Sequence, residues 1–314
     1  MSSQKVALVI GASRGIGRQI AIDLAKNGYA VIVSAKSTSD ASTTHPFPPN
    51  PNSNASTIST VCREILEAGF TATAIPCDVR SHASISSLIS QTISTYGHID
   101  VLVYNSGAIY HSSVLTTPLS RYMLMESVNP NGLYATIQSC IPHWKAQDWN
   151  ARIVVICPPI YSRFFSGKTA YAMGKVGMSV LVQGLGMDFS RMGSSGQNMA
   201  ITGLWPAVAI ESAATAHFSS PDEDLRHPSI FSDAILSIVK AKTEYVNGSL
   251  LLDEDYLREH DGVSDFSKYA LVPGTTPRRI MPMKFPDLRV EEQDDEGVRM
   301  DSAKKEESGK LSKL

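Results

Sequence analysis

The fold of this chain is decided by the stretch Val6-Ala7-Leu8-Val9-Ile10-Gly11-Ala12-Ser13-Arg14-Gly15-Ile16-Gly17. Its first five residues form a continuous apolar run, which is typical of a strand buried on both faces. A G-x-x-x-G-x-G turn follows, and a helical apolar pattern then runs from Ile16 to Asn27, with Gly28 at the expected stop. Such a turn lets the backbone approach a pyrophosphate closely, beside the partial positive charge of a helix start. We therefore expect a dinucleotide site here, with simple packing of the turn as the alternative.

The same alternation of short apolar runs and amphipathic stretches continues through the first 210 positions. The other expected strands are residues 30–35, 72–75, 101–104, 153–156 and 201–204. Strands and helices that alternate in this way predict an α/β fold, namely a doubly wound parallel sheet of the Rossmann type with helices on both faces. We assign residues 1–285 to this single domain.

Two segments depart from this rhythm. Residues 37–57 are rich in Ser, Thr and Asn and hold four prolines, so they predict a mobile surface insertion between the second strand and the next helix. Residues 286–314 are highly charged and offer almost nothing apolar to bury, so we expect a disordered, solvated tail.

Composition excludes several classes of function. The 28 basic and 30 acidic residues give a net charge of −2, which leaves no broad cationic surface for nucleic acid or anionic lipid. No apolar run approaches the roughly 18 residues that a membrane span needs, and the amino end does not resemble a secretory signal. The four cysteines form no C-x-x-C pair, so we expect buried thiols, no disulfide framework and no metal site. A small-molecule partner is the remaining expectation.

The end of the second expected strand bears on the choice of nucleotide. A fold specific for NAD would place a carboxylate there, to accept a hydrogen bond from the ribose 2′-hydroxyl. Lys36 occupies this place instead, nineteen positions after Gly17. Together with Arg14, it would face a 2′-phosphate, so the sequence favours NADP over NAD. A solvated lysine at a strand end is the alternative.

A tyrosine and a lysine stand four residues apart in Tyr171-Ala172-Met173-Gly174-Lys175, so they project from one face of a helix. An ammonium close to a phenol favours the phenolate, and we therefore expect Lys175 to lower the pKa of Tyr171 from its reference value near 10. Tyr171 would then be a usable acid/base. Taken alone, the spacing is equally typical of a surface helix pair.

Three further motifs accompany the glycine turn and the Tyr-Lys pair. They are Asp78-Val79, Asn105-Ser106-Gly107-Ala108 and Ser127-Val128-Asn129. In this order and spacing, the five motifs resemble the short-chain dehydrogenase/reductase family over about residues 5–250. Within the family, Leu204-Trp205-Pro206 and Tyr269-Ala270-Leu271-Val272-Pro273-Gly274 look most like the amino-terminal domain of the hydroxysteroid dehydrogenase-like type-two proteins.

The resemblance implies a set of cofactor-binding residues for NADP. The phosphates would be held by the residues of the glycine turn, Gly11, Ser13, Arg14, Gly15, Ile16 and Gly17, and Lys36 would select NADP. Asp78 and Val79 would flank the adenine, Asn105 and Gly107 would form the floor beneath the ribose, and Pro206 and Ile210 would border the nicotinamide.

The resemblance also implies a catalytic set. Tyr171 would exchange a proton with the substrate oxygen, Lys175 would grip the nicotinamide ribose, and Asn129 would anchor a water relay behind Lys175. The hydride would come from the cofactor. The family further implies a homodimer or homotetramer.

One family feature is missing. A serine usually stands about thirteen residues before the tyrosine, where this chain has Pro158. The neighbouring Cys157 is a weak donor, and losing one oxyanion-type donor costs about a hundredfold in rate. Ser162 and Ser166 are the candidates to replace it.

Two functions follow from these motifs. The first is an NADP(H)-dependent oxidoreductase that interconverts a carbonyl and a secondary alcohol, with a lipid or fatty-acyl substrate suggested by the expected compartment. The second is a catalytically weakened NADP(H)-binding protein with a regulatory or binding role, which the missing serine motivates.

The chain ends in Ser312-Lys313-Leu314, the tripeptide read by the peroxisomal import receptor. We therefore expect a peroxisomal protein with that receptor as a partner. A charged terminus that matches by chance is the alternative.

Overall fold

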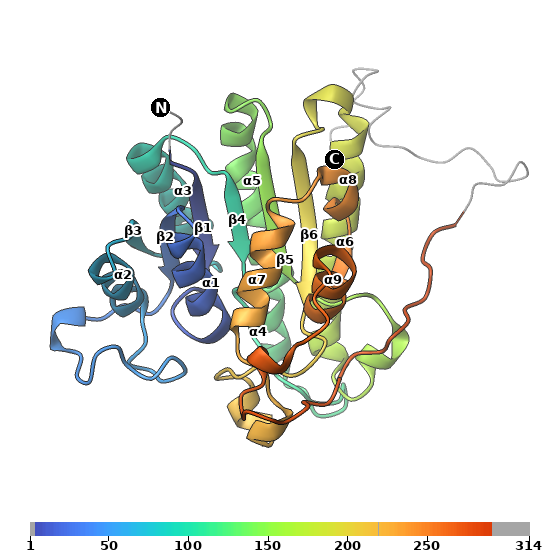
Figure 1. Cartoon of the computed structure of the whole chain (residues 1–314). Coiled ribbons are helices and arrows are strands. Elements are labelled where there is room, and N and C mark those ends of the chain that lie inside the picture. Colours follow the sequence, from blue (N-terminus) through green and yellow to red (C-terminus); the bar gives the residue numbers. More distant parts are fainter. Residues whose placement is uncertain (1–3, 219, 291–314) are drawn as a thin grey trace, which may run out of the picture.

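The apolar run near the amino end forms an interior strand of a seven-stranded parallel sheet in a computed structural model that describes residues 4–218 and 220–290 (Figure 1). The strand order is β3-β2-β1-β4-β5-β6-β7. The strands are β1 (Val6–Ile10), β2 (Ala30–Ala35), β3 (Ala72–Pro76), β4 (Val101–Tyr104), β5 (Ala151–Ile156), β6 (Met199–Trp205) and β7 (Leu250–Leu252). This order confirms the doubly wound fold. The sequence missed only β7, because a three-residue edge strand is too short to show a period.

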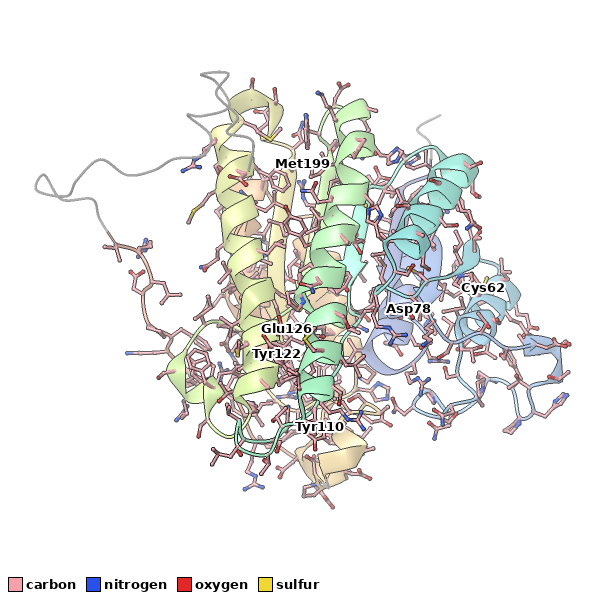
Figure 2. The ribbon with its side chains drawn as sticks, turned by 180° about the vertical axis from the view of Figure 1, so that it is seen from behind. Cys62, Asp78, Tyr110, Tyr122, Glu126 and Met199 are labelled. Carbon is pink, nitrogen blue, oxygen red and sulfur yellow. The ribbon has the colours of Figure 1, made fainter. Side chains whose placement is uncertain are left out.

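Helices cover both faces of the sheet. The helices are α1 (Gly15–Lys26), α2 (Ile58–Glu67), α3 (His82–Tyr96), α4 (Leu119–Val128), α5 (Pro130–Ala146), α6 (Thr169–Arg191), α7 (Ser229–Ile238), α8 (Thr243–Val246) and α9 (Asp253–Asp261). One apolar core joins the sheet to α1, α2, α7 and α9, which face the viewer in Figure 1. A second core joins the opposite face to α3, α5 and α6, which Figure 2 shows from behind.

The functional edge of the sheet follows from its topology. Strand β1 pairs with β2 on one side and with β4 on the other, so the chain connections leave in opposite directions at this point. In doubly wound sheets, ligands bind in the crevice outside the carboxyl ends of such neighbouring strands. The glycine turn after β1 and the Asn105 motif after β4 both lie at this edge.

The proline-rich insertion lies between β2 and α2, where the sequence placed it. It contains one short 3-10 turn, Ala41–Thr43, and its later part lies against the glycine turn. There the Pro51 carbonyl accepts a hydrogen bond from the Gly15 N–H at 3.0 Å, and the buried Ser56 hydroxyl donates to the Ser13 carbonyl at 2.7 Å. No sequence pattern predicted these contacts, because prolines and small polar residues indicate a loop but not the residues that the loop contacts.

The structure also bears on the cysteines, on membrane-spanning helices, on metal sites and on the charged tail. All four cysteines are buried and unpaired, as expected. Within residues 4–218 and 220–290, no helix combines the length and apolar character needed to cross a membrane, and no group of His, Cys, Asp and Glu side chains is arranged to hold a metal. Residues 286–290 are exposed and adopt no helix or strand. The rest of the charged tail, with Ser312-Lys313-Leu314, lies outside the described residues.

Candidate active site

The glycine turn packs directly on the end of β4. Gly11 has a φ of +88°, and a Cβ there would lie 2.6 Å from the backbone nitrogen of Ser106. A Cβ on Gly17 would overlap the Gly11 carbonyl oxygen and lie 2.5 Å from Asn105 Nδ2. Asn105 Nδ2 donates to that same Gly11 oxygen at 2.9 Å. Glycine is therefore needed at both positions, because backbone atoms occupy the space of any side chain.

A cleft of about 500 Å³ opens beside this turn. Its lining comes from the ends of three neighbouring strands and from the segment after β6, namely Gly11, Ser13, Arg14, Gly15, Ile16, Ala35, Lys36, Ser37, Asn105, Ser106, Gly107, Ile109, Ser212, Ala213 and Ala214. These residues include no carboxylate, and the first turn of α1 holds no acidic residue. The backbone N–H groups of Ile16 and Gly17 make no hydrogen bond within the described residues. The cleft therefore fits a pyrophosphate.

Two cations stand at the outer edge of this cleft. Arg14 Nη1 donates to Asn54 Oδ1 of the insertion at 2.7 Å, and its Nη2 donates to Ser37 Oγ at 3.4 Å. The largely exposed Lys36 lies 3.6 Å from Asp78 Oδ2. Both expected phosphate-binding side chains thus lie at the end of β2, where they could contact the ribose of a bound nucleotide.

The structure does not bring the expected adenine-binding pair into the cleft lining. Asp78 makes a two-pronged contact with Arg80, and those hydrogen bonds hold the pKa of its carboxyl well below the ordinary value. Val79 is buried in the core between the sheet and α5, beside Gly132. The roles of Asp78 and Val79 remain predictions, and only the Asp78 carboxylate approaches the cleft edge through Lys36.

Two of the three expected catalytic side chains, Lys175 and Asn129, lie beneath Gly107. Lys175 Nζ is buried and donates to the Ile156 carbonyl at 2.8 Å. Both ends of the Asn129 amide are held by Ala108, whose N–H donates to Oδ1 at 2.9 Å and whose carbonyl accepts from Nδ2 at 3.0 Å. A Cβ on Gly107 would lie 3.5 Å from Lys175 Nζ and 3.6 Å from Asn129 Oδ1. These two polar groups therefore face the cleft floor from below.

The expected lowering of the Tyr171 pKa is wrong for this structure. Burial raises the pKa of Tyr171, and burial also lowers the pKa of Lys175 to about 8. The physical reason is that desolvation disfavours both charged forms, while the Lys175 ammonium is directed to the Ile156 carbonyl and lies 5.4 Å from the Trp205 ring centre. Tyr171 is consequently a neutral phenol with a proton to donate.

Tyr171 lines a second pocket of about 350 Å³, which shares Ile16, Ile109, Ser212 and Ala214 with the cofactor cleft. Its walls include the aromatic side chains Tyr161, Phe164 and Trp205 and also His111, Lys168 and Met281. Pro206 and Ile210 line it too, and their place beside the nicotinamide stays a prediction. The sequence missed the other wall residues because they come from segments far apart in the chain and share no spacing.

Nothing replaces the missing serine in the way we expected. Pro158 is buried, and its carbonyl accepts a hydrogen bond from Ser179 Oγ at 2.7 Å. Cys157 is fully buried in the core, where burial raises the pKa of its thiol. Ser162 and Ser166 are exposed and do not line the pocket, so that expectation is wrong. The His111 ring instead lies edge-on to the Tyr171 ring with centroids 4.9 Å apart, and burial and the nearby Lys168 charge lower its pKa.

A buried carboxyl fixes the chain where it passes the pocket. Asp253 Oδ1 accepts hydrogen bonds from the N–H groups of Ala207 at 2.8 Å and Glu254 at 2.7 Å. Its Oδ2 has no partner within the described residues, and burial raises the pKa of Asp253 to about 7. The residue after Pro206 is therefore positioned by a side chain from the start of α9, a contact that no local pattern predicts.

We expect Asp253→Asn to remove a pH dependence of stability. The folded wild type retains this proton to higher pH than the unfolded chain does, so its free energy of unfolding should fall as pH rises from about 4 to about 7. Asparagine keeps the acceptor for Ala207 and does not titrate. Urea unfolding of both proteins at pH 4, 5.5 and 7.5 should show the variant gaining on the order of 2 kcal/mol relative to wild type across this range. A difference that stays constant with pH would contradict the assignment.

Comparisons with known proteins agree with this geometry. The family description "short chain dehydrogenase" matches residues 5–46 and 51–212, and the gap between these two stretches, residues 47–50, falls inside the proline-rich insertion. Hydroxysteroid dehydrogenase-like protein 2 of Danio rerio is 36% identical over 272 residues, which are 85% of this chain and 60% of that protein. The chain therefore spans about 60% of the length of this curated relative.

Solved structures give the same result for the fold. A putative dehydrogenase from Xanthomonas campestris superimposes with a TM-score of 0.75 and 32% identity over 92% of this chain and 99% of that one. A metagenomic short-chain oxidoreductase in complex with NADP has a TM-score of 0.62 over 80% of this chain and 96% of that one. At 22% identity, the second likeness is one of fold alone.

Proposed function

The chain belongs to the short-chain dehydrogenase family, and on this premise we propose that it is an NADP(H)-dependent oxidoreductase that interconverts a carbonyl and a secondary alcohol. One observation carries the proposal. The buried Tyr171 lines a pocket that adjoins the cleft of the glycine turn, so a substrate in the pocket lies beside a nucleotide in the cleft. A panel of ketones and 3-ketoacyl thioesters with NADPH tests it, and no turnover of any member would contradict it.

The residues of this chain have separate tasks in that reaction. NADPH would supply the hydride, the N–H groups of Ile16 and Gly17 would hold its pyrophosphate, and Arg14 would contact its 2′-phosphate. The neutral Tyr171 donates its proton to the substrate oxygen during reduction and becomes a phenolate, and during oxidation that phenolate form accepts the proton of the alcohol. Lys175 and Asn129 lie behind Gly107, where Lys175 would grip the nicotinamide ribose and Asn129 would anchor a water relay. The aromatic pocket walls exclude water from the reacting atoms.

We base the preference for NADP on Arg14 and Lys36 at the cleft edge. We expect Arg14→Ala to raise the KM for NADPH by about 10- to 100-fold, because a guanidinium–phosphate pair is a strong, charge-assisted contact. The KM for NADH should change only slightly. Arg80→Ala is the matched control, since Arg80 is bound to Asp78 and does not line the cleft. Steady-state kinetics with both nucleotides measure the effect, and an equal rise in both KM values would refute the role of Arg14.

We also propose that the protein resides in peroxisomes and acts there on a lipid or fatty-acyl intermediate. The carboxyl-terminal Ser312-Lys313-Leu314 supports the compartment, through the import receptor that reads this tripeptide. The apolar lining of the Tyr171 pocket is compatible with a lipid chain.

We propose that the chain is a homodimer or homotetramer in which α6 faces a second copy. Met173, Val180 and Met187 are each more than half exposed and stand seven residues apart, so they form one apolar stripe along this helix. Tyr134 of α5 is similarly exposed. Figure 2 shows α5 in green and α6 in yellow-green beside each other on this side of the molecule.

The second function, a weakened NADP(H)-binding protein, is favoured by Pro158 alone. In this case the cleft would still bind the nucleotide, but the pocket would lack the usual serine hydroxyl beside Tyr171. Tight binding of NADPH in a fluorescence titration, with no turnover on the whole carbonyl panel, would distinguish this function from the first.

A further inference from the structure

Among the described residues that line the Tyr171 pocket, Lys168 carries the one full charge. The lining residues include the rings of Tyr161, Phe164 and Trp205 and no Asp or Glu. Lys168 stands at the start of α6, three residues before Tyr171. Its ammonium lies 4.2 Å from the centre of the Phe164 ring. A positive charge therefore lies on an otherwise uncharged wall, close to the proposed proton donor.

This ammonium lacks an acidic partner within the described residues, and no Asp or Glu lines the pocket around it. Lys168 is half-buried, and burial lowers its pKa, so the charge has lost part of its hydration. A cation–π contact with the face of the Phe164 ring offsets part of the lost hydration energy. A partly desolvated cation without a counter-charge is costly, and a bound anion compensates it more fully than a ring does.

Phe164 also sets the spacing between the cation and the proton donor. Its ring centre is 4.2 Å from Lys168 Nζ and 6.3 Å from the centre of the Tyr171 ring. One substrate can therefore reach both groups if a short carbon chain separates its carbonyl from its anionic end. The apolar part of such a molecule would lie against Phe164 and Trp205, whose rings meet edge-to-face.

We propose that Lys168 is an anion subsite of this pocket and that the substrates are apolar molecules carrying both a carbonyl or secondary alcohol and an anionic group, such as a keto or hydroxy acid. The inference rests on the proposed oxidoreductase function and names its substrate class. The anion is recognised by charge and by hydrogen bonds from the ammonium, so a carboxylate and a phosphate ester share the required chemistry.

The test compares substrates that differ only in charge. A medium-chain keto acid, its methyl ester and the corresponding keto phosphate are assayed with NADPH in the full-length protein. We expect wild type to prefer the acid or the phosphate to the ester by about 10- to 100-fold in kcat/KM, mainly through KM. Lys168→Met keeps the apolar stem and removes the charge, so the ratio of kcat/KM for acid and ester should fall to near one. Lys168→Arg should keep most of it.

Two controls make the result specific. Arg163→Met removes an exposed cation that stands five residues before Lys168 and does not line the pocket. This variant should show the same ratio of kcat/KM for acid and ester as wild type. Calorimetry with the keto acid and NADP⁺-saturated protein measures binding without turnover. There, Lys168→Met should weaken binding at least about tenfold.

The outcomes separate the two proposals. Turnover of acid and ester with no preference in wild type, or an unchanged preference in Lys168→Met, would overturn the anion subsite and leave the oxidoreductase intact. Absence of turnover for every substrate would count against the oxidoreductase, and equal calorimetric binding of the acid to wild type and Lys168→Met would then overturn the subsite as well. If the phosphate is preferred to the carboxylate, the subsite stands with phosphate as its ligand.

Discussion

Tyr171→Phe is expected to lower kcat for carbonyl reduction by about 10³-fold or more, because it removes the proton donor and leaves the ring in place. The buried ring would keep its contacts with His111 and Phe164. Stability and the dissociation constant of NADPH should therefore stay close to the wild-type values. Stopped-flow or steady-state assays of NADPH oxidation, together with a fluorescence titration of NADPH, measure the two effects separately.

Tyr161→Phe is the matched control for this prediction. Tyr161 lines the same pocket, but its hydroxyl donates to the Met281 sulfur at 3.5 Å, a weak acceptor. Its loss should change kcat only a few-fold. Full turnover by Tyr171→Phe, or an equal loss in the two variants, would show that another group moves the proton.

Gly17→Ala is expected to lower the free energy of unfolding by about 3 kcal/mol and to weaken NADPH binding by at least about tenfold. The added methyl group would overlap the Gly11 carbonyl oxygen and press on Asn105 Nδ2, so the helix α1 must move away from the turn. That movement displaces the N–H groups proposed to hold the pyrophosphate. Urea unfolding and NADPH titration measure the two losses.

Gly184→Ala supplies the control for this substitution. Gly184 is also a helical glycine, in α6, and a Cβ there meets nothing within 4 Å. Alanine should leave stability unchanged or raise it by up to about 1 kcal/mol through helix propensity. If Gly17→Ala proved as harmless as Gly184→Ala, the close packing of the glycine turn on β4 would be refuted.

Much of the site could be predicted because its parts are local patterns. The apolar run 6–10, the glycine turn and the four-residue spacing of Tyr171 and Lys175 each fix a strand, a turn or a shared helix face within a few residues. The structure confirms these elements and brings Tyr171, Pro206 and Ile210 to one pocket. Asp78 and Val79 were less predictable, because a motif after a strand does not say on which side of the sheet its residues end.

The amino-acid order alone predicted the parallel sheet, the place of the turn proposed to bind phosphate and the helix face that Tyr171 shares with Lys175, since backbone geometry and side-chain period depend on near neighbours in the chain. The tertiary structure decided the rest. Three features depend on which residues become neighbours and how deeply they are buried in the folded chain. They are the raised pKa of Tyr171, the hydrogen bond from the Ala207 N–H to Asp253 and the placement of Lys168 beside Phe164. Desolvation and charge–charge interactions act through space, and the distances between the interacting groups are set only when the chain folds.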